Sequence, residues 1–397
     1  MTIYSNISEL LTPHDSITDA ALVVADGRIE WVGAEGDLPA AYDEADRVDL
    51  RGNGVLPALV DSHTHLIWGG DRIHEYEQRS EGASYEAILQ AGGGIYNTVR
   101  ATQEATEEEL LQLAEERARV FLKEGVATLE VKSGYGLTAE HELKMLRVAR
   151  ALQEKTPQRI VPTLLAHVIP RDWNREDYVE MFCRELIPEV ARQGLAEAVD
   201  VFCDEGAFTV DETRRIFEAA RLHDLQIKAH AEQLAHTGAT QLVAEMGGLS
   251  ADHLEHCTAD DWQALAKAGT VGTFLPGATV ILKKPFPDAR AAADAGVKVG
   301  IATDFNPGSS PMTSLFLAMQ LTMALGGLTL REALAAGTAH AADALARPDL
   351  ARPDLGRLQP GAQADFLVVN HPNPRYPLYH WGPVDLAGLY VSGQQVT

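Results

Sequence analysis

The chain has 397 residues, of which 46% are hydrophobic and 23% charged, a composition typical of a globular protein with one large domain and a smaller companion. Its formal net charge of −24 argues against nucleic acid or an anionic membrane as a partner, but it is compatible with a small anionic substrate that a local arginine binds. Three cysteines without a CxxC motif, no secretory signal and no apolar run near the ~18 residues of a membrane helix predict a cytoplasmic protein.

Both ends of the chain have the composition of β-structure. Near the N-terminus, residues 21–24 and 28–33 are β-prone runs separated by Asp26-Gly27, a dipeptide that favours a hairpin turn. Near the C-terminus, residues 366–369 and 388–393 have the same character. We therefore predict one small β-sandwich domain assembled from residues 1–56 and 346–397.

The middle of the chain, residues 57–345, alternates short apolar runs with amphipathic stretches. The apolar runs lie near residues 58–63, 126–131, 160–167, 199–203, 226–230, 249–253, 270–275 and 298–303. The amphipathic stretches include residues 107–123, 139–152, 175–191, 210–223 and 258–267. Eight strands alternating with helices predict an α/β fold, a (β/α)8 TIM-type barrel. An open doubly wound sheet is the alternative, but it requires a glycine-rich phosphate turn after its first strand, where this chain has His63-Thr64-His65.

Polar side chains follow most of the predicted strands. The first strand leads into His63 and His65, and this i, i+2 spacing in extended chain points both imidazoles the same way. Later strand ends carry His167, His230, His253 and Asp304. Because barrel enzymes place their chemistry at the C-terminal ends of the strands, this arrangement predicts a metal-dependent active site.

Three imidazoles and one carboxylate form the predicted metal site: His63, His65, His230 and Asp304. This donor set is typical of a catalytic zinc or a related divalent ion that keeps one coordination position open. Such an ion lowers the pKa of bound water from ~15.7 to ~7. We expect Asp304 to be both a ligand and the general base. We expect His253 to stabilise the developing oxyanion; orienting the metal site is its alternative role.

Residues 69–105 are long for a single connection between a strand and a helix. Gly92-Gly93-Gly94 within this stretch fits a mobile flap and a plain structural turn equally well.

The order of these residues resembles the amidohydrolase superfamily, which has HxH on strand one, histidines on strands five and six, and aspartate on strand eight. The segment from Gly54 to His65 resembles the sequence that opens that superfamily's barrel, with Ala58 where glycine is usual. The run from Gly356 to Asp365 resembles the segment that returns to the small β domain. Together these likenesses extend over nearly the whole chain.

Residues 130–137, 228–234, 252–255 and 304–309 are similar to one branch of that superfamily. Its members open the ring of 4-imidazolone-5-propanoate to N-formimidoyl-L-glutamate in histidine degradation, with one zinc or iron ion. The resemblance implies a homodimer in which metal-bound hydroxide attacks the ring carbonyl. The substrate contacts that it implies are Arg72, Tyr135, His167, Gln233, Asn306, Gly308 and Ser309.

Two of these residues also carry information of their own. Arg72 suits a substrate with a propionate, because guanidinium binds carboxylate in a bidentate fork; a surface arginine is the alternative. Related deaminases often carry glutamate where this chain has Gln233, and an amide cannot titrate. This residue argues against a purine deaminase.

Three further interpretations stay open at this point. One is another cyclic amidase or a nucleobase deaminase of the same superfamily, and another is an inactive barrel that serves as a scaffold. The third concerns Lys132. Dinuclear relatives use a carbamylated lysine to bridge two metals, but that lysine is on strand four, whereas Lys132 falls on strand two. We therefore expect one metal. Glu130 and Lys132 then form a charged pair inside the barrel.

Overall fold

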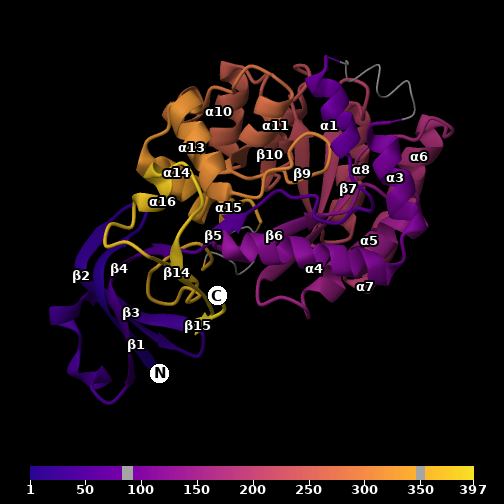
Figure 1. The fold of residues 1–397 in the computed structure, drawn as a ribbon. Coiled ribbons are helices and arrows are strands. Elements are labelled where there is room, and N and C mark those ends of the chain that lie inside the picture. The colour runs from indigo at the N-terminus through magenta and orange to yellow at the C-terminus, as the bar shows by residue number, and fades with distance from the viewer. Residues whose placement is uncertain (83–92, 346–353) are drawn as a thin grey trace.

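The computed structural model describes residues 1–82, 93–345 and 354–397, which form a large barrel and a smaller sheet (Figure 1). Eight parallel strands build the barrel in the spatial order β12-β11-β10-β9-β8-β7-β6-β5, so each strand pairs with its sequence neighbour. Their bounds are Leu59–Asp61 (β5), Val126–Lys132 (β6), Arg159–Ala166 (β7), Ala198–Cys203 (β8), Gln226–Ala231 (β9), Ser250–His253 (β10), Val271–Phe274 (β11) and Val299–Ile301 (β12). The predicted (β/α)8 barrel is confirmed.

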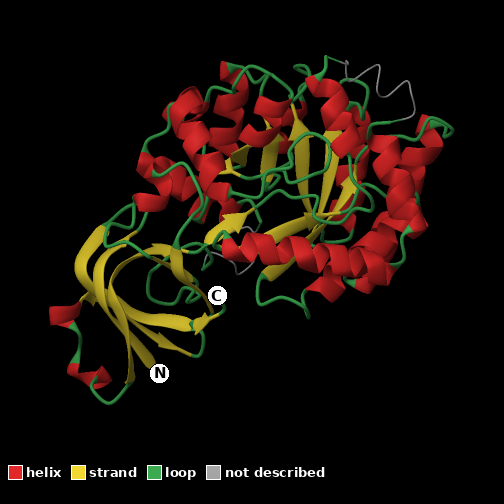
Figure 2. Cartoon of the chain, viewed as in Figure 1, coloured by secondary structure: helices red, strands yellow, loops and turns green. Residues whose placement is uncertain are grey.

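Helices surround this sheet (Figure 2). They are Ile73–Ser80 (α1), Ile95–Glu104 (α3), Glu107–Lys123 (α4), Ala139–Leu152 (α5), Arg175–Met181 (α6), Ile187–Gln193 (α7), Val210–Leu222 (α8), Ala239–Glu245 (α9), Ala259–Ala268 (α10), Pro276–Ile281 (α11), Ala289–Asp294 (α12), Leu315–Gly326 (α13), Leu330–Ala336 (α14), Ala339–Asp343 (α15) and Tyr376–Tyr379 (α16). Local sequence explains where several begin: Thr106 and Glu109 form a capping box that supplies hydrogen bonds to the first turn of α4. Its apolar face, which includes Phe121, is buried in the barrel core.

The predicted helical stretch over residues 175–191 is confirmed, but the helix is not regular throughout. Here α6 passes into a π-helical turn, Phe182–Leu186, before α7 begins at Ile187. Pro188 stands at the start of α7 and has no backbone N–H, so it cannot donate a hydrogen bond to the preceding turn. A wider π-turn at this position is one way to accommodate the interruption.

The barrel closes between its first and last strands through the residues that follow them. Thr64 and Phe305 form a parallel bridge, with the Asp304 amide donating to the His63 carbonyl at 3.0 Å. Below this bridge, the Thr303 hydroxyl donates to the Asp61 carboxylate at 2.6 Å. The segment that carries the two strand-one histidines is therefore joined to the segment that carries the strand-eight aspartate.

Both ends of the chain build the small domain, as predicted. Its seven strands form one mixed sheet in the order β15-β14-β13-β4-β1-β2-β3, which is strongly bent in Figure 2. Their bounds are Thr2–Leu11 (β1), Ser16–Ala25 (β2), Arg28–Ala34 (β3), Asp46–Pro57 (β4), Phe366–Val369 (β13), Leu386–Val391 (β14) and Gln394–Gln395 (β15). The predicted turn at Asp26-Gly27 joins β2 to β3, and its glycine has a φ of 76°.

An ion pair connects the two parts of the molecule. The Arg159 guanidinium, at the start of β7, contacts the Asp365 carboxylate beside β13. Between the two parts, β4 ends at Pro57 and β5 begins at Leu59. The predicted border at residue 346 lies outside the described residues, and the domain limits stay a prediction.

The long connection over residues 69–105 contains α1 and α3. Residues 83–92, which include Gly92 of the glycine triplet, lie outside the described part of the chain. Gly94 has a φ of 71° and directly precedes α3, so it begins the helix in a conformation that few other residues adopt.

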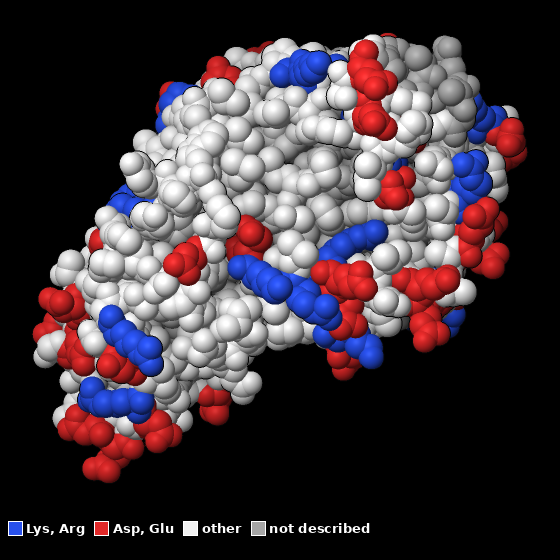
Figure 3. Space-filling view, in the orientation of Figure 1, with Lys and Arg blue, Asp and Glu red and all other residues white. Residues whose placement is uncertain are grey.

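Charged side chains on the face in Figure 3 lie mostly around its edge, with acidic and basic groups close together. Among the described helices, none has both the length and the apolar composition that a bilayer crossing requires.

Candidate active site

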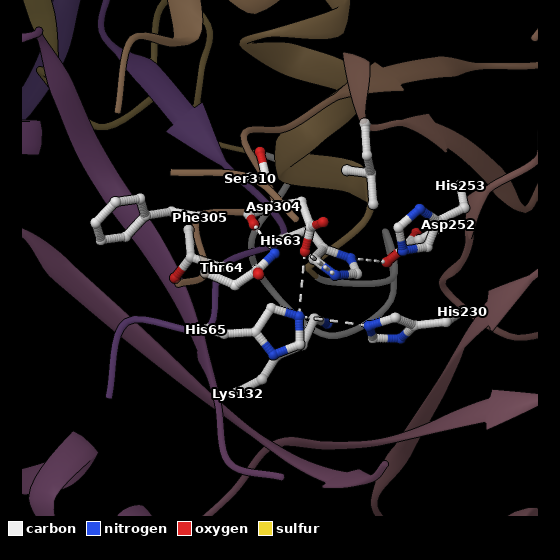
Figure 4. Close-up of polar contacts among 12 residues, drawn as sticks. His63, Thr64, His65, Lys132, His230, Asp252, His253, Asp304, Phe305 and Ser310 are labelled. Atoms are coloured by element: carbon white, nitrogen blue, oxygen red, sulfur yellow. Dashed lines mark hydrogen bonds and ion pairs between the residues drawn. The ribbon is translucent and has the colours of Figure 1, made fainter. Parts of the chain in front are cut away.

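The predicted ligands meet at the C-terminal end of the barrel (Figure 4). The Nε2 atom of His65 lies 3.2 Å from Asp304 Oδ1 and 3.5 Å from His230 Nε2. The Nε2 atom of His63 lies 3.5 Å from the same oxygen of Asp304. All four side chains are buried. Residues from strands one, five and eight thus gather around one small volume.

This arrangement fits a metal ion. Tetrahedral coordination with bonds of ~2.0–2.1 Å separates neighbouring ligand atoms by ~3.3–3.4 Å, which matches the spacings above. His63 Nε2 is buried and has no hydrogen-bond partner among the described residues. The carboxylate oxygen near it, Asp304 Oδ1, lies 3.5 Å away. Burial lowers the pKa of both His63 and His65, so the imidazoles are neutral, as metal ligation requires.

Two buried aspartates orient the histidines from behind. The Nδ1 of His63 lies 2.7 Å from Asp252 Oδ2, and the Nδ1 of His230 lies 3.1 Å from Asp200 Oδ1. When Nδ1 donates its proton to a carboxylate, Nε2 is left with a lone pair that faces the cluster. These contacts select the tautomer that a metal needs.

A layer of buried charges lies beneath these aspartates. Lys132 Nζ contacts Glu130 Oε2 at 2.7 Å and Asp200 Oδ2 at 2.6 Å. Lys228 Nζ contacts Glu130 Oε1 at 2.8 Å and lies 3.7 Å from Asp252 Oδ2. Although burial alone lowers the pKa of Lys132, the carboxylates of Asp200 and Glu130 raise it above its usual value. The expected charged pair inside the barrel is confirmed, and Lys132 is an ammonium partner of carboxylates.

Replacing Asp252 by asparagine should weaken metal binding about 10- to 100-fold, because the partner that fixes the His63 tautomer loses its charge. Competition with a chelator of known affinity measures this directly. Asp294→Asn is a matched control, since Asp294 is exposed and pairs with Arg290 on the surface. Equal metal affinity for Asp252→Asn and the control would contradict the role of Asp252.

A cavity of about 520 Å³ opens in front of the cluster. It brings together every predicted substrate residue: Arg72, Tyr135, His167, Gln233, Asn306, Gly308 and Ser309. The predicted oxyanion residue, His253, also lines it. The ring of His167 is stacked against that of His65, with centroids 5.7 Å apart, and its Nδ1 lies 3.1 Å from the Gly134 carbonyl oxygen.

Arg72 is a buried cation in this cavity, not a surface residue. Its Nε donates to Glu75 Oε2 at 2.7 Å, and the other oxygen of Glu75 accepts from the Gly94 amide at 2.9 Å. A side chain at Gly308 would overlap Arg72 Nη1. Glu75 therefore orients the guanidinium, and Gly308 leaves room for it. Within the described residues its terminal nitrogens make no hydrogen bond, so they can bind an anion.

The loop after β12 is organised by Asn306. Its Oδ1 accepts from the amides of Gly308 and Ser309, both at 2.8 Å, and its Nδ2 donates to the Asp304 carbonyl at 2.7 Å. The loop thus holds the backbone of Asp304 next to the cavity wall.

Gln233 and Glu232 are neighbours in the sequence but have different surroundings. Gln233 lines the cavity, whereas the Glu232 carboxylate accepts from the amides of Thr237, Gly238 and Thr240. Asp204, at the end of β8, holds this loop by accepting from the Gln233 amide at 2.7 Å.

Comparison with known proteins identifies the family. The model of the Amidohydrolase family matches residues 55–396. Imidazolonepropionase of Deinococcus radiodurans is 46% identical, with 100% of this chain and 99% of that protein covered. Imidazolonepropionase of Geobacillus kaustophilus is 41% identical, with 98% and 92% covered. The chain belongs to the imidazolonepropionases, within the amidohydrolase family.

Solved structures of other proteins share the amidohydrolase fold. An adenosine deaminase from Xanthomonas campestris with bound zinc has a TM-score of 0.75 at 18% identity, covering 99% of this chain and 92% of that one. A 5-methylcytosine deaminase from Klebsiella pneumoniae has a TM-score of 0.77 at 16% identity, covering 100% and 97%. Identities this low show the fold alone.

Several residues of the site were not predicted from the sequence. Asp200, Asp252 and Glu75 orient functional side chains, and Phe202 and Lys284 line the cavity. A carboxylate in the middle of an otherwise apolar strand was the available signal for Asp200. Nothing in the local sequence of Lys284 marks it as a cavity residue.

Proposed function

We propose that this chain hydrolyses 4-imidazolone-5-propanoate to N-formimidoyl-L-glutamate, a step of histidine degradation. The observation that carries the proposal is the group of three Nε2 atoms and one carboxylate oxygen at metal-ligand spacing, beside a cavity that contains a buried arginine. Full-length similarity to imidazolonepropionases supports the choice of substrate.

The proposed ligands are His63, His65, His230 and Asp304, and the ion is zinc or iron. A divalent ion in such a site lowers the pKa of a coordinated water from ~15.7 to ~7, so hydroxide is available at neutral pH. Asp304 accepts a proton from the attacking water and later returns it to the departing ring nitrogen. His253 stabilises the oxyanion that develops on the ring carbonyl. The bond between the carbonyl carbon and that nitrogen then breaks.

The remaining cavity residues bind and orient the substrate. Arg72 binds the propionate, because its Nε is held by Glu75 and its terminal nitrogens are left to the ligand. Tyr135, His167 and Gln233 surround the ring, and the loop of residues 306–309 contacts substrate or product near the metal.

Arg72→Ala should raise KM about 10- to 100-fold, because hydrogen bonds to a charged group contribute about 1.5–3 kcal/mol. We expect kcat to change much less, since the guanidinium binds a part of the substrate that does not react. Steady-state kinetics separate the two constants. Arg100→Ala, an exposed arginine of α3 that bonds to Asn97, is the control. A fall in kcat with unchanged KM would show that Arg72 has another role.

A coupled assay tests the proposed reaction. Imidazolonepropionate is generated in situ from urocanate, and its loss is compared with the spontaneous rate. We expect faster loss with the metal-loaded protein and none beyond the spontaneous rate with Asp304→Asn. Ammonia release from guanine or cytosine, without turnover of imidazolonepropionate, would favour a deaminase instead. A metal-free site in carefully purified protein would favour an inactive barrel.

The homodimer and the cytoplasmic location stay predictions, as does the absence of a nucleic acid or membrane partner. Light scattering of the purified protein measures the oligomeric state.

A further inference from the structure

His253 and Glu255 lie on one unusual turn after β10. The backbone has a positive φ at two consecutive residues, 87° at His253 and 75° at Leu254. Residues with side chains rarely adopt this conformation, and it persists only where surrounding contacts enforce it. Here the Leu254 amide donates to the Ala231 carbonyl at 3.0 Å, and the His256 amide donates to the Glu232 carbonyl at 2.8 Å. The turn is therefore held against the loop that follows β9.

This turn places two buried polar atoms opposite each other. His253 Nδ1 and Glu255 Oε2 are 4.0 Å apart, and neither atom has a hydrogen-bond partner in the described part of the chain. The side chain of Glu255 is 0% exposed, so its carboxylate cannot exchange this contact for water. Buried polar groups without a partner are costly, and the nearby imidazole is the natural donor.

Thr279 of α11 holds the other half of the carboxylate. Its hydroxyl donates to Glu255 Oε1 at 2.7 Å, which leaves Oε2 as the oxygen available to His253. Burial raises the pKa of Glu255 to about 7, so a hydrogen bond from an imidazole would favour its ionised form. Closing the 4.0 Å gap breaks no existing hydrogen bond of either group.

We propose that Glu255 is a positioning residue. Its carboxylate accepts a hydrogen bond from Nδ1–H of His253 and so fixes the imidazole with Nε2 toward the reacting atoms. This inference rests on the role proposed above for His253. Catalytic hydrogen bonds are often long before substrate binds and shorten in the complex. Glu255 would orient His253 in the same way in which Asp252 orients His63 and Asp200 orients His230.

The test is a double-mutant cycle on the metal-loaded enzyme. Glu255→Ala should lower kcat about 10- to 100-fold, with metal content unchanged, because partners of this kind act through the group that they orient. KM should stay near the wild-type value. Glu255→Gln should recover part of the loss, since its carbonyl oxygen can still accept from Nδ1. In the His253→Ala variant, adding Glu255→Ala should lower kcat by less than about twofold, because the two residues act as one unit.

Glu232→Ala is the matched control, because it removes a buried carboxylate of the adjacent loop that accepts hydrogen bonds from backbone amides. It should change stability and leave kcat unchanged. If Glu255→Ala does not fold, Thr279→Val gives the same test, since it removes the donor to Glu255 and should lower kcat only when His253 is present.

The outcomes separate the two proposals. An active His253→Ala variant would overturn the role of His253 and, with it, this inference. An inactive His253→Ala with a fully active Glu255→Ala would overturn the positioning role alone. Equal losses from Glu255→Ala with and without His253 would also overturn it, because they indicate a purely structural effect.

Discussion

Asp304→Asn should lower kcat by about 10³-fold or more, because one substitution alters both a proposed metal ligand and the proposed general base. Its Oδ1 is the atom that both His63 Nε2 and His65 Nε2 approach, at 3.5 and 3.2 Å. Asparagine has the same shape but cannot accept the proton of the attacking water. Because asparagine fills the same space as the buried aspartate, the fold should survive the substitution.

The experiment needs kinetics, metal analysis and a thermal melt on the same preparation. Asp294→Asn, on the exposed surface of α12, is the control and should match the wild type in all three. A folded Asp304→Asn variant that keeps its rate within tenfold would refute the assignment. If the variant binds metal normally and is still inactive, its role as base is separated from its role as ligand.

Lys132→Met should lower the free energy of unfolding by about 3–5 kcal/mol, because it removes the ammonium group that contacts Asp200 and leaves Glu130 with Lys228 alone. The Lys132 ammonium is 0% exposed and lies 2.7 Å from Glu130 and 2.6 Å from Asp200. Methionine is similar in length, so little of the loss would come from a cavity. Urea denaturation of the metal-free protein measures the change without a contribution from bound metal.

Arg147→Met provides the comparison for this experiment. Arg147 pairs with Glu107 at 2.6 Å, but both side chains are more than 40% exposed. Exposed pairs contribute about 0–1 kcal/mol, so this variant should lie close to the wild type. Equal changes in the free energy of unfolding for Lys132→Met and Arg147→Met would mean that the buried ion pairs stabilise the fold no more than an exposed pair does.

Hydrophobic patterning was enough to predict the barrel. Each of the eight predicted apolar runs overlaps a strand, and the predicted helices over residues 107–123 and 139–152 coincide with α4 and α5. These segments have a strong period and clear caps, so local sequence determines them. The π-turn over residues 182–186 was missed because it depends on one proline within an otherwise amphipathic stretch.

The site was predictable where a residue stands at a strand end, and less so elsewhere. His63, His230 and Asp304 follow directly from the barrel rule. Arg72 was singled out by the resemblance and by the fit of guanidinium to a carboxylate, but its position in a long connection says nothing about burial. Its partner Glu75 and the strand residue Asp200 were missed, because their roles depend on contacts between elements that are distant in the sequence.

The seam between β5 and β12 has a consequence for how the enzyme acquires its ion. His63 and His65 stand at the first strand of the barrel and Asp304 at the last, joined by the Thr64–Phe305 bridge. During synthesis the donor set therefore stays incomplete until nearly the whole barrel has left the ribosome. Metal binding adds its stabilising free energy to a chain that presents all four donors. The bound ion therefore stabilises the full-length protein more than truncated chains that lack Asp304.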